Sequence, residues 1–101
     1  MTDLEMTRLC MEAMGGLPLI EHGGKLLLGS KSCMGPIYDP LNDDVEAMAL
    51  VKKFKLSIGY SDGWSCRKDG ADGLECRTFH YDNLNRAIVE CVAKMQAERK
   101  A

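Results

Sequence analysis

Residues 37–64 restrict the fold of this chain more than any other part of the sequence. A proline-bracketed acidic turn, an amphipathic helical pattern, an alternating strand pattern and a turn at residues 61–63 follow one another there without a gap. Residues 42–44, Asn-Asp-Asp, offer N-cap oxygens and negative charge to a helix start. The apolar positions of that helix are Val45, Ala47, Met48, Leu50, Val51 and Phe54. A helix that passes directly into a strand and a turn predicts the α+β class.

An antiparallel meander is predicted to follow this helix. Residues 56–60 alternate between apolar and small or polar side chains, and Asp62-Gly63 is a strong hairpin turn. Trp64 and Cys66 resume the alternation, and a second glycine-containing turn at residues 68–73 leads to a third strand at residues 74–80.

The remaining elements flank this unit. Thr2 and Glu5 form a capping box for a helix over about residues 3–14, and Gly23-Gly24 joins two apolar runs into a hairpin. Residues 29–40 contain two glycines and two prolines, which predicts an exposed loop. A last helix begins near Asp82. The expected order is α-ββ-α-βββ-α in one domain, residues 1–101: a small antiparallel sheet with three helices, similar to an α/β/α sandwich.

The predicted core combines apolar positions from the first helix, two strands of the meander and the last helix. The last helix presents one apolar stripe, which comprises Leu84, Ala87, Ile88, Cys91, Val92 and Met95. We expect a core that contains Leu9, Ile58, Trp64, Ile88 and Val92.

Charge and cysteine content exclude several classes of protein. The chain has 13 Lys and Arg against 15 Asp and Glu, a net charge of −2, and no concentrated basic stretch, so nucleic-acid binding is disfavoured. The start lacks a signal-peptide pattern, and no apolar run is long enough to span a bilayer. Five cysteines without a CxxC pair predict reduced thiols in a cytosol, with Cys10 and Cys91 as small core residues.

Two pieces of the chain together resemble a known family. They are the opening Thr2-Asp3-Leu4-Glu5 helix that ends at Met14-Gly15, and the run Ile37-Tyr38-Asp39-Pro40-Leu41-Asn42-Asp43-Asp44 that leads through Ala47 and Met48 to Ile58 and Trp64. In order and spacing they resemble the small tailed-phage and prophage proteins of the phage ABA sandwich domain, related to the Nin-region X proteins of lambda-like phages. The resemblance implies helices packed around a small antiparallel sheet, and a phage accessory protein without catalytic residues to transfer. Met48 stands where relatives often have tryptophan.

A zinc site is the sharpest metal hypothesis in the sequence. Cys66, Cys76 and His80 lie on two strands of one predicted hairpin, and Cys33 could complete a tetrahedral set. Structural zinc sites usually contain cysteines two to four residues apart, a spacing that is missing here. Free, partly buried thiols are therefore the preferred interpretation, and a Cys66–Cys76 disulfide is disfavoured in a reducing compartment.

Catalytic signatures are missing as well. His22 and His80 are the usual candidates for a general base, and neither lies near a nucleophile motif. The glycines around Lys25 and Lys31 do not follow the phosphate-loop order, and the Asp43-Asp44 helix start is a poor anion site because its own carboxylates neutralise it. A basic patch of lysines 52, 53, 55 and 68 near Trp64 is better explained by helix-dipole compensation and strand solubility. We expect no cofactor.

The sequence thus predicts a non-catalytic phage or prophage accessory protein that binds a macromolecule, a host or phage protein, in the host cytoplasm. Its interface is expected on the exposed loop, at Lys31, Cys33, Met34 and Ile37. The alternatives are a small metal-dependent or nucleotide-handling enzyme and a weak nucleic-acid-binding module. The sequence leaves the oligomeric state open.

Overall fold

Three helices and two small antiparallel sheets make up the described part of the chain, residues 1–15, 19–30, 33–68 and 76–100 of a computed structural model. In chain order the elements are α1 (Asp3–Ala13), β1 (Leu19–His22), β2 (Lys25–Ser30), β3 (Cys33–Ile37), α2 (Asp44–Phe54), β4 (Ser57–Tyr60), β5 (Trp64–Lys68), β6 (Cys76–His80) and α3 (Leu84–Lys100). The predicted α+β class with three helices is confirmed. The strands divide into the sheets β1-β2-β3 and β4-β5-β6.

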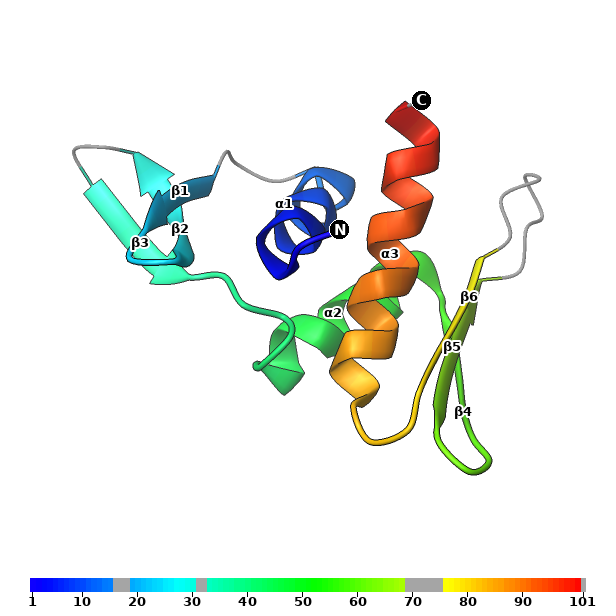
Figure 1. The fold of residues 1–101 in the computed structure, drawn as a ribbon. Coiled ribbons are helices and arrows are strands. Elements are labelled where there is room, and N and C mark those ends of the chain that lie inside the picture. Colours follow the sequence, from blue (N-terminus) through cyan, green and yellow to red (C-terminus); the bar gives the residue numbers. More distant parts are fainter. Residues whose placement is uncertain (16–18, 31–32, 69–75, 101) are drawn as a thin grey trace.

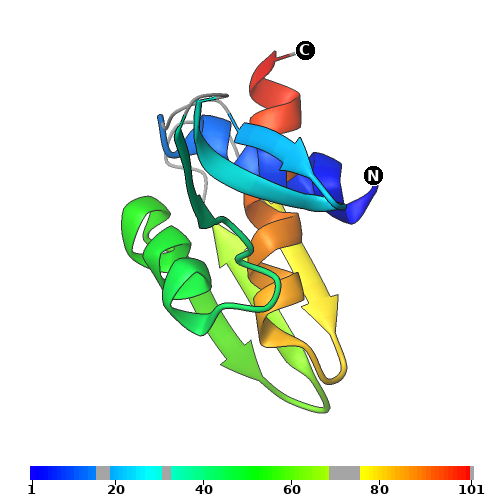
Figure 2. The ribbon, with the colours of Figure 1, turned by 90° about the vertical axis from the view of Figure 1, so that its left-hand side faces the viewer.

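The helices lie between the two sheets. In Figure 1 the sheet β1-β2-β3 lies beside α1, α3 stands next to α1, and the sheet β4-β5-β6 covers the far side of α3. Figure 2 shows the first sheet in front of α1 and the upper half of α3, with α2 beside the lower half. No helix in the described residues is long and apolar enough to cross a membrane.

Local chemistry explains where the first two helices begin. The Thr2 side chain accepts a hydrogen bond from Glu5 N at 3.1 Å, as the capping box predicts. Asp43 is the N-cap of α2, and its carboxylate accepts from Val45 N and Glu46 N at 2.9 and 3.2 Å. The last turn of α2 contains basic residues, and the left-handed Lys55 ends it.

The predicted loop at residues 29–40 is wrong, because most of this segment belongs to the first sheet. β2 continues to Ser30, and β3 pairs with it in the register Gly29↔Met34 and Ser30↔Cys33, with an irregularity between Leu27 and Gly29. Proline and glycine suggested a loop, but β3 is an edge strand, where proline is tolerated. The Gly23-Gly24 turn is confirmed, with φ of 58° and 77°.

The core is built around α3. Seven of its side chains are at most 2% exposed: Ala87, Ile88, Val89, Cys91, Val92, Ala93 and Met95. The predicted stripe omitted Val89 and Ala93. Their burial gives α3 a second internal face, since the helix contacts α1 and α2 as well as β5 and β6. Buried residues of α1 and α2, including Met6, Cys10, Ala47 and Leu50, belong to the same cluster.

Trp64 is the member of the predicted core that the structure places elsewhere. Ile88 and Val92 are fully buried, and Leu9 and Ile58 are half-buried against the core cluster. Trp64 is half-buried at the start of β5, where its ring contacts Tyr60. The indole is therefore an end-of-sheet residue.

A buried hydrogen bond ties the second sheet to α3. The Thr78 hydroxyl on β6 donates to the carbonyl oxygen of Ala87, and both residues are at least 95% buried. Thr78→Val removes this bond and leaves no donor unsatisfied. We expect it to lower the free energy of unfolding by about 1 kcal/mol, the net value of one such bond. Chemical denaturation measures this, and an unchanged or raised stability would show that the bond has no net value.

Candidate functional site

Four aromatic side chains lie where the β4–β5 turn meets the end of β6, in two pairs on opposite faces of the sheet. Tyr60 and Trp64 share the face of the inner-phase residue His80, whereas Phe79, with Tyr81 against it, is on the outer face. Tyr60 and Trp64 are direct cross-strand partners, and their ring centroids lie 4.9 Å apart at an interplanar angle of 60°. Phe79 and Tyr81 form a second edge-to-face pair with centroids 5.3 Å apart at 79°. We call these four residues the aromatic end.

This end is unusually exposed for aromatic side chains. Tyr60 is 67% exposed, Tyr81 76% and Phe79 46%. Each ring is held in a T-shaped pair, an arrangement that contributes about 0.5–1.5 kcal/mol beyond area burial. The aromatic end is therefore apolar surface that is already ordered before anything binds it.

Gly63 is required for the shape of the aromatic end. A Cβ atom at this position would lie 2.5 Å from Phe79 Cζ and 3.0 Å from the His80 carbonyl oxygen. In the preceding position Asp62 takes the positive φ of 66°. The glycine of the predicted Asp62-Gly63 turn is thus needed for space beneath the Phe79 ring.

A groove of about 420 Å³ adjoins the aromatic end at Trp64. Its lining comes from the first turns of α2, the start of β5 and the start of α3: Asp44, Met48, Trp64, Asp82, Asn83, Leu84 and Asn85. Asn85 Nδ2 donates to Asp44 Oδ1 at 2.8 Å, and this hydrogen bond joins the two helix starts at the groove. We call it the α2–α3 groove.

A polar network occupies the surface between β6, α3 and α1. His80 Nε2 lies 2.8 Å from Glu90 Oε2, and Arg86 lies 3.4 Å from the other oxygen of Glu90. Arg86 also contacts Asp3 at 3.2 Å. His80 is thus held by a carboxylate in a network that joins three elements. Among the described residues, no cysteine or serine side chain hydrogen-bonds to His80.

Three thiols meet on the inner side of the second sheet. Cys66 on β5 and Cys76 on β6 face α3, where the Cys91 thiol lies beside Cys66 and donates to the Cys76 carbonyl oxygen, with 3.8 Å between sulfur and oxygen. Burial raises the pKa of Cys10 to about 12 and that of Cys76 to about 11, and the hydrogen bond with Cys66, together with burial, raises the pKa of Cys91. The hydrogen bond from Cys91 lowers the pKa of Cys66, but this thiol has no exposed surface. Protonated or inaccessible thiols are poor nucleophiles.

The residues weighed as an alternative zinc set are not brought together in the described part of the chain. Cys66 and Cys76 have Cys91 as their neighbour, while the His80 ring is paired with Glu90. The Cys33 side chain lies outside the described part. Among the residues described, no group of three His, Cys, Asp or Glu is placed to hold a metal ion.

Of the four residues that the sequence predicts for the interface, the structure describes the side chain of one, Ile37. Ile37 ends β3 and is 50% exposed. Lys31 and the side chains of Cys33 and Met34 lie outside the described part of the chain, as does the His22 side chain. The four-residue set therefore stays a prediction.

One of the four lysines, Lys68, contacts the end of α2. Lys68 Nζ donates to the Phe54 carbonyl oxygen at the end of α2, at 3.1 Å. This contact is the helix C-terminal compensation that the sequence indicated.

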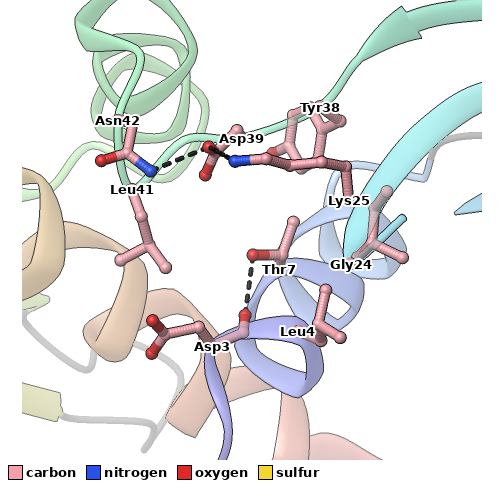
Figure 3. A pocket seen from close by; sticks show the side chains of 10 residues that line it. Asp3, Leu4, Thr7, Gly24, Lys25, Tyr38, Asp39, Leu41 and Asn42 are labelled. Carbon is pink, nitrogen blue, oxygen red and sulfur yellow. Dashed lines mark hydrogen bonds and ion pairs between the residues drawn. The ribbon is translucent and has the colours of Figure 1, made fainter. Parts of the chain in front are cut away.

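A smaller cavity of about 150 Å³ lies between α1, the β1–β2 turn and residues 38–42 (Figure 3). Its polar groups already contact one another: Asn42 Nδ2 donates to Asp39 Oδ2 at 2.8 Å, Lys25 Nζ lies 3.9 Å from the same oxygen, and the Thr7 hydroxyl donates to Asp3 O. Figure 3 shows these pairs along the cavity wall. The α2–α3 groove is the better candidate.

Sequence reasoning missed Tyr60, Phe79 and Tyr81, although one signal was present. Cys76, Thr78 and His80 share the inner phase of β6, so Phe79 shares the outer phase with Arg77. An aromatic residue in the polar phase of a strand indicates exposed apolar surface.

We expect Gly63→Ala to destabilise the protein by about 1–3 kcal/mol, because the new methyl group collides with Phe79 and with backbone. Near-UV circular dichroism should also change as the aromatic pairs shift. Gly59→Ala is the matched control, since its Cβ would meet only Ser65 Oγ at 3.3 Å. Equal stability of the two variants would contradict the proposed fit of Phe79 over Gly63.

Thiol burial predicts alkaline sensitivity. The unfolded thiols lose their protons near pH 9.0, whereas folded Cys76 and Cys10 keep theirs to about 11 and 12. Above pH 9 the folded state binds more protons, so the free energy of unfolding should fall between about pH 9 and 12. Urea denaturation across this range should give a shallower fall for Cys10→Ala than for wild type. An identical slope would rule out a contribution from Cys10.

Comparison with known proteins gives no match to a family model, a curated protein or a solved structure. The resemblance to the phage ABA sandwich domain therefore stays a prediction from the sequence pattern. The geometry of the aromatic end and the α2–α3 groove carries the functional argument that follows.

Proposed function

We propose that this chain is a non-catalytic bacteriophage or prophage accessory protein that binds a host protein through the aromatic end. The sequence resemblance supports the phage assignment. The observation that carries the binding function is the exposure of Tyr60, Phe79 and Tyr81 at one end of the second sheet, by 67%, 46% and 76%, with each ring in a T-shaped pair.

Physical chemistry favours this surface as a protein interface. Tyrosine, tryptophan and phenylalanine are enriched in interface cores, where a few large anchors contribute most of the binding energy. Rings that are ordered before binding lose little conformational entropy on association. The reactive groups of the described residues support a non-catalytic role, because the thiols are protonated or inaccessible and His80 is paired with Glu90.

Affinity capture from a lysate of the host bacterium tests the proposal. Wild-type protein should retain one host protein in stoichiometric amount. The double variant Tyr60→Ser/Tyr81→Ser should bind that protein about 30-fold or more weakly, because the loss of even one interface anchor costs about 2 kcal/mol. Both side chains are largely exposed, so the thermal melt should stay close to wild type.

Val45→Ser is the matched control, because Val45 is 79% exposed but lies on α2 outside the aromatic end. Its affinity should equal that of wild type. Retained binding by the tyrosine double variant, with loss in Lys31→Ser/Cys33→Ser/Met34→Ser/Ile37→Ser, would move the interface to the first sheet. Failure of any protein to co-purify would contradict the proposed function.

One observation favours weak single-stranded nucleic-acid binding as a second candidate. Arg67 and Arg77 are direct cross-strand partners on the outer face of the second sheet, next to Phe79. Basic residues beside an aromatic ring suit a nucleic-acid strand. Salt-dependent binding of a labelled oligonucleotide, lost in Arg77→Gln, would support this candidate over a protein partner.

A further inference from the structure

We propose that the α2–α3 groove is the specificity pocket of this surface and receives an arginine side chain from the partner protein. The inference rests on the proposed binding function and names the chemistry that the partner presents. The groove contains Trp64, whose ring contacts Tyr60, so the groove adjoins this half of the aromatic end, while Phe79 and Tyr81 lie on the other face of the sheet.

The apolar wall of the groove suits an aliphatic stem and a flat cation. Met48, Trp64 and Leu84 line it, and Met48 is 41% exposed. A guanidinium group stacks on an indole face through cation–π attraction while its methylene stem covers neighbouring apolar surface. The edge-to-face contact with Tyr60 holds the Trp64 ring in place for such stacking.

The polar wall supplies the opposite charge. Asp44 and Asp82 line the groove together with Asn83 and Asn85, and no basic side chain is among the lining residues that the structure describes. A planar guanidinium donates up to five hydrogen bonds and matches a carboxylate with two parallel ones. Lysine has a compact ammonium group that cannot pair with a carboxylate in this way or stack as a plane, so arginine fits better.

The positive dipole ends at the starts of α2 and α3 would repel a cation, but the negative charge of the nearby carboxylates is larger. Each helix N-terminus is equivalent to about +0.5 charge, together about one positive charge. The two lining carboxylates contribute −2, and Asp43 adds another negative charge at the α2 cap. Three of the N–H donors at these helix starts are also occupied, because Asp43 accepts from Val45 N and Glu46 N, and Asn83 Oδ1 accepts from Arg86 N.

The volume also supports this occupant. About 420 Å³ lies within the range of about 300–1,000 Å³ that is typical of ligand sites. It exceeds one arginine side chain, which leaves space for an apolar neighbour of the arginine against Leu84 and Met48. The partner is thus expected to present an arginine flanked by apolar residues.

Trp64 gives a direct readout, because it is the only tryptophan of the chain. The probe is the blocked tripeptide acetyl-Leu-Arg-Leu-amide, and its control is the same peptide with citrulline, which keeps the shape and removes the charge. Titration of Trp64 fluorescence should saturate with half-maximal change at about 1 mM or below for the arginine peptide. The citrulline peptide should bind about tenfold more weakly, the loss expected for one cation–π and charge contact.

Three variants test which carboxylates bind the arginine cation. Asp44→Asn and Asp82→Asn should each weaken the arginine peptide by about threefold or more, within the range of single charge contacts. Asn at position 44 still accepts the Asn85 hydrogen bond, so the groove keeps its shape. Asp62→Asn is the matched control: it removes the same charge from an exposed turn outside the groove, and asparagine tolerates the positive φ of Asp62.

Three results would overturn the inference. They are equal binding of the citrulline peptide, no saturable change with the arginine peptide up to about 10 mM, and a Trp64 response to inorganic phosphate at constant ionic strength, which would indicate an anion site. Failure here is distinguishable from failure of the proposed function. A captured partner that depends on Tyr60 and Tyr81 but binds Asp44→Asn and Asp82→Asn normally would refute the pocket alone, whereas peptide binding without any captured protein would refute the partner.

Discussion

The burial of α3 on more than one side is the constraint on which the rest of the structure depends. Its side chains from Ala87 to Met95 are internal at seven of nine positions, and the two exceptions are Glu90 and Lys94. A helix with so wide an apolar surface needs a cover on each side. The sheet β4-β5-β6 supplies one cover, and α1 with α2 supplies the other. Loss of either cover would leave the helix with exposed apolar surface.

Polar contacts at the margins of α3 fix how its covers are oriented. Thr78 bonds to the Ala87 carbonyl from the sheet side, and Cys10 lies 3.5 Å from the Val89 carbonyl from the α1 side. The ion pairs of Arg86 join Asp3 and Glu90, and His80 joins Glu90 from β6. These groups hold the elements together. At the end of the second sheet, the half-buried Trp64 and two carboxylates, those of Asp44 and Asp82, line the α2–α3 groove.

Some elements could be predicted from sequence patterns and others could not. The Asp43 cap, the Thr2 cap and the Gly23-Gly24 turn are recognisable because each depends on residues within four positions of one another. β3 was mistaken for a loop because its strand character comes from pairing with β2 and not from its own composition. Trp64 was assigned to the core because a tryptophan in an alternating strand is usually covered, whereas here β5 begins at the edge of the region that α3 covers. The aromatic end was overlooked for a related reason: exposure of Phe79 follows from the pairing phase of β6.

The sequence by itself determined the α+β class, the position of the three helices and the turns at Gly23-Gly24 and Asp62-Gly63, because caps, glycines and apolar periodicity act over a few neighbouring residues. Only the tertiary structure decided that α3 has two buried faces, that the strands form two sheets with helices between them, and that Asp44 meets Asn85 across a groove beside Trp64. These features depend on residues tens of positions apart, whose proximity is set by how the apolar faces of whole elements are buried together. A candidate site assembled from the starts of two helices and a strand therefore appears only after the elements have packed.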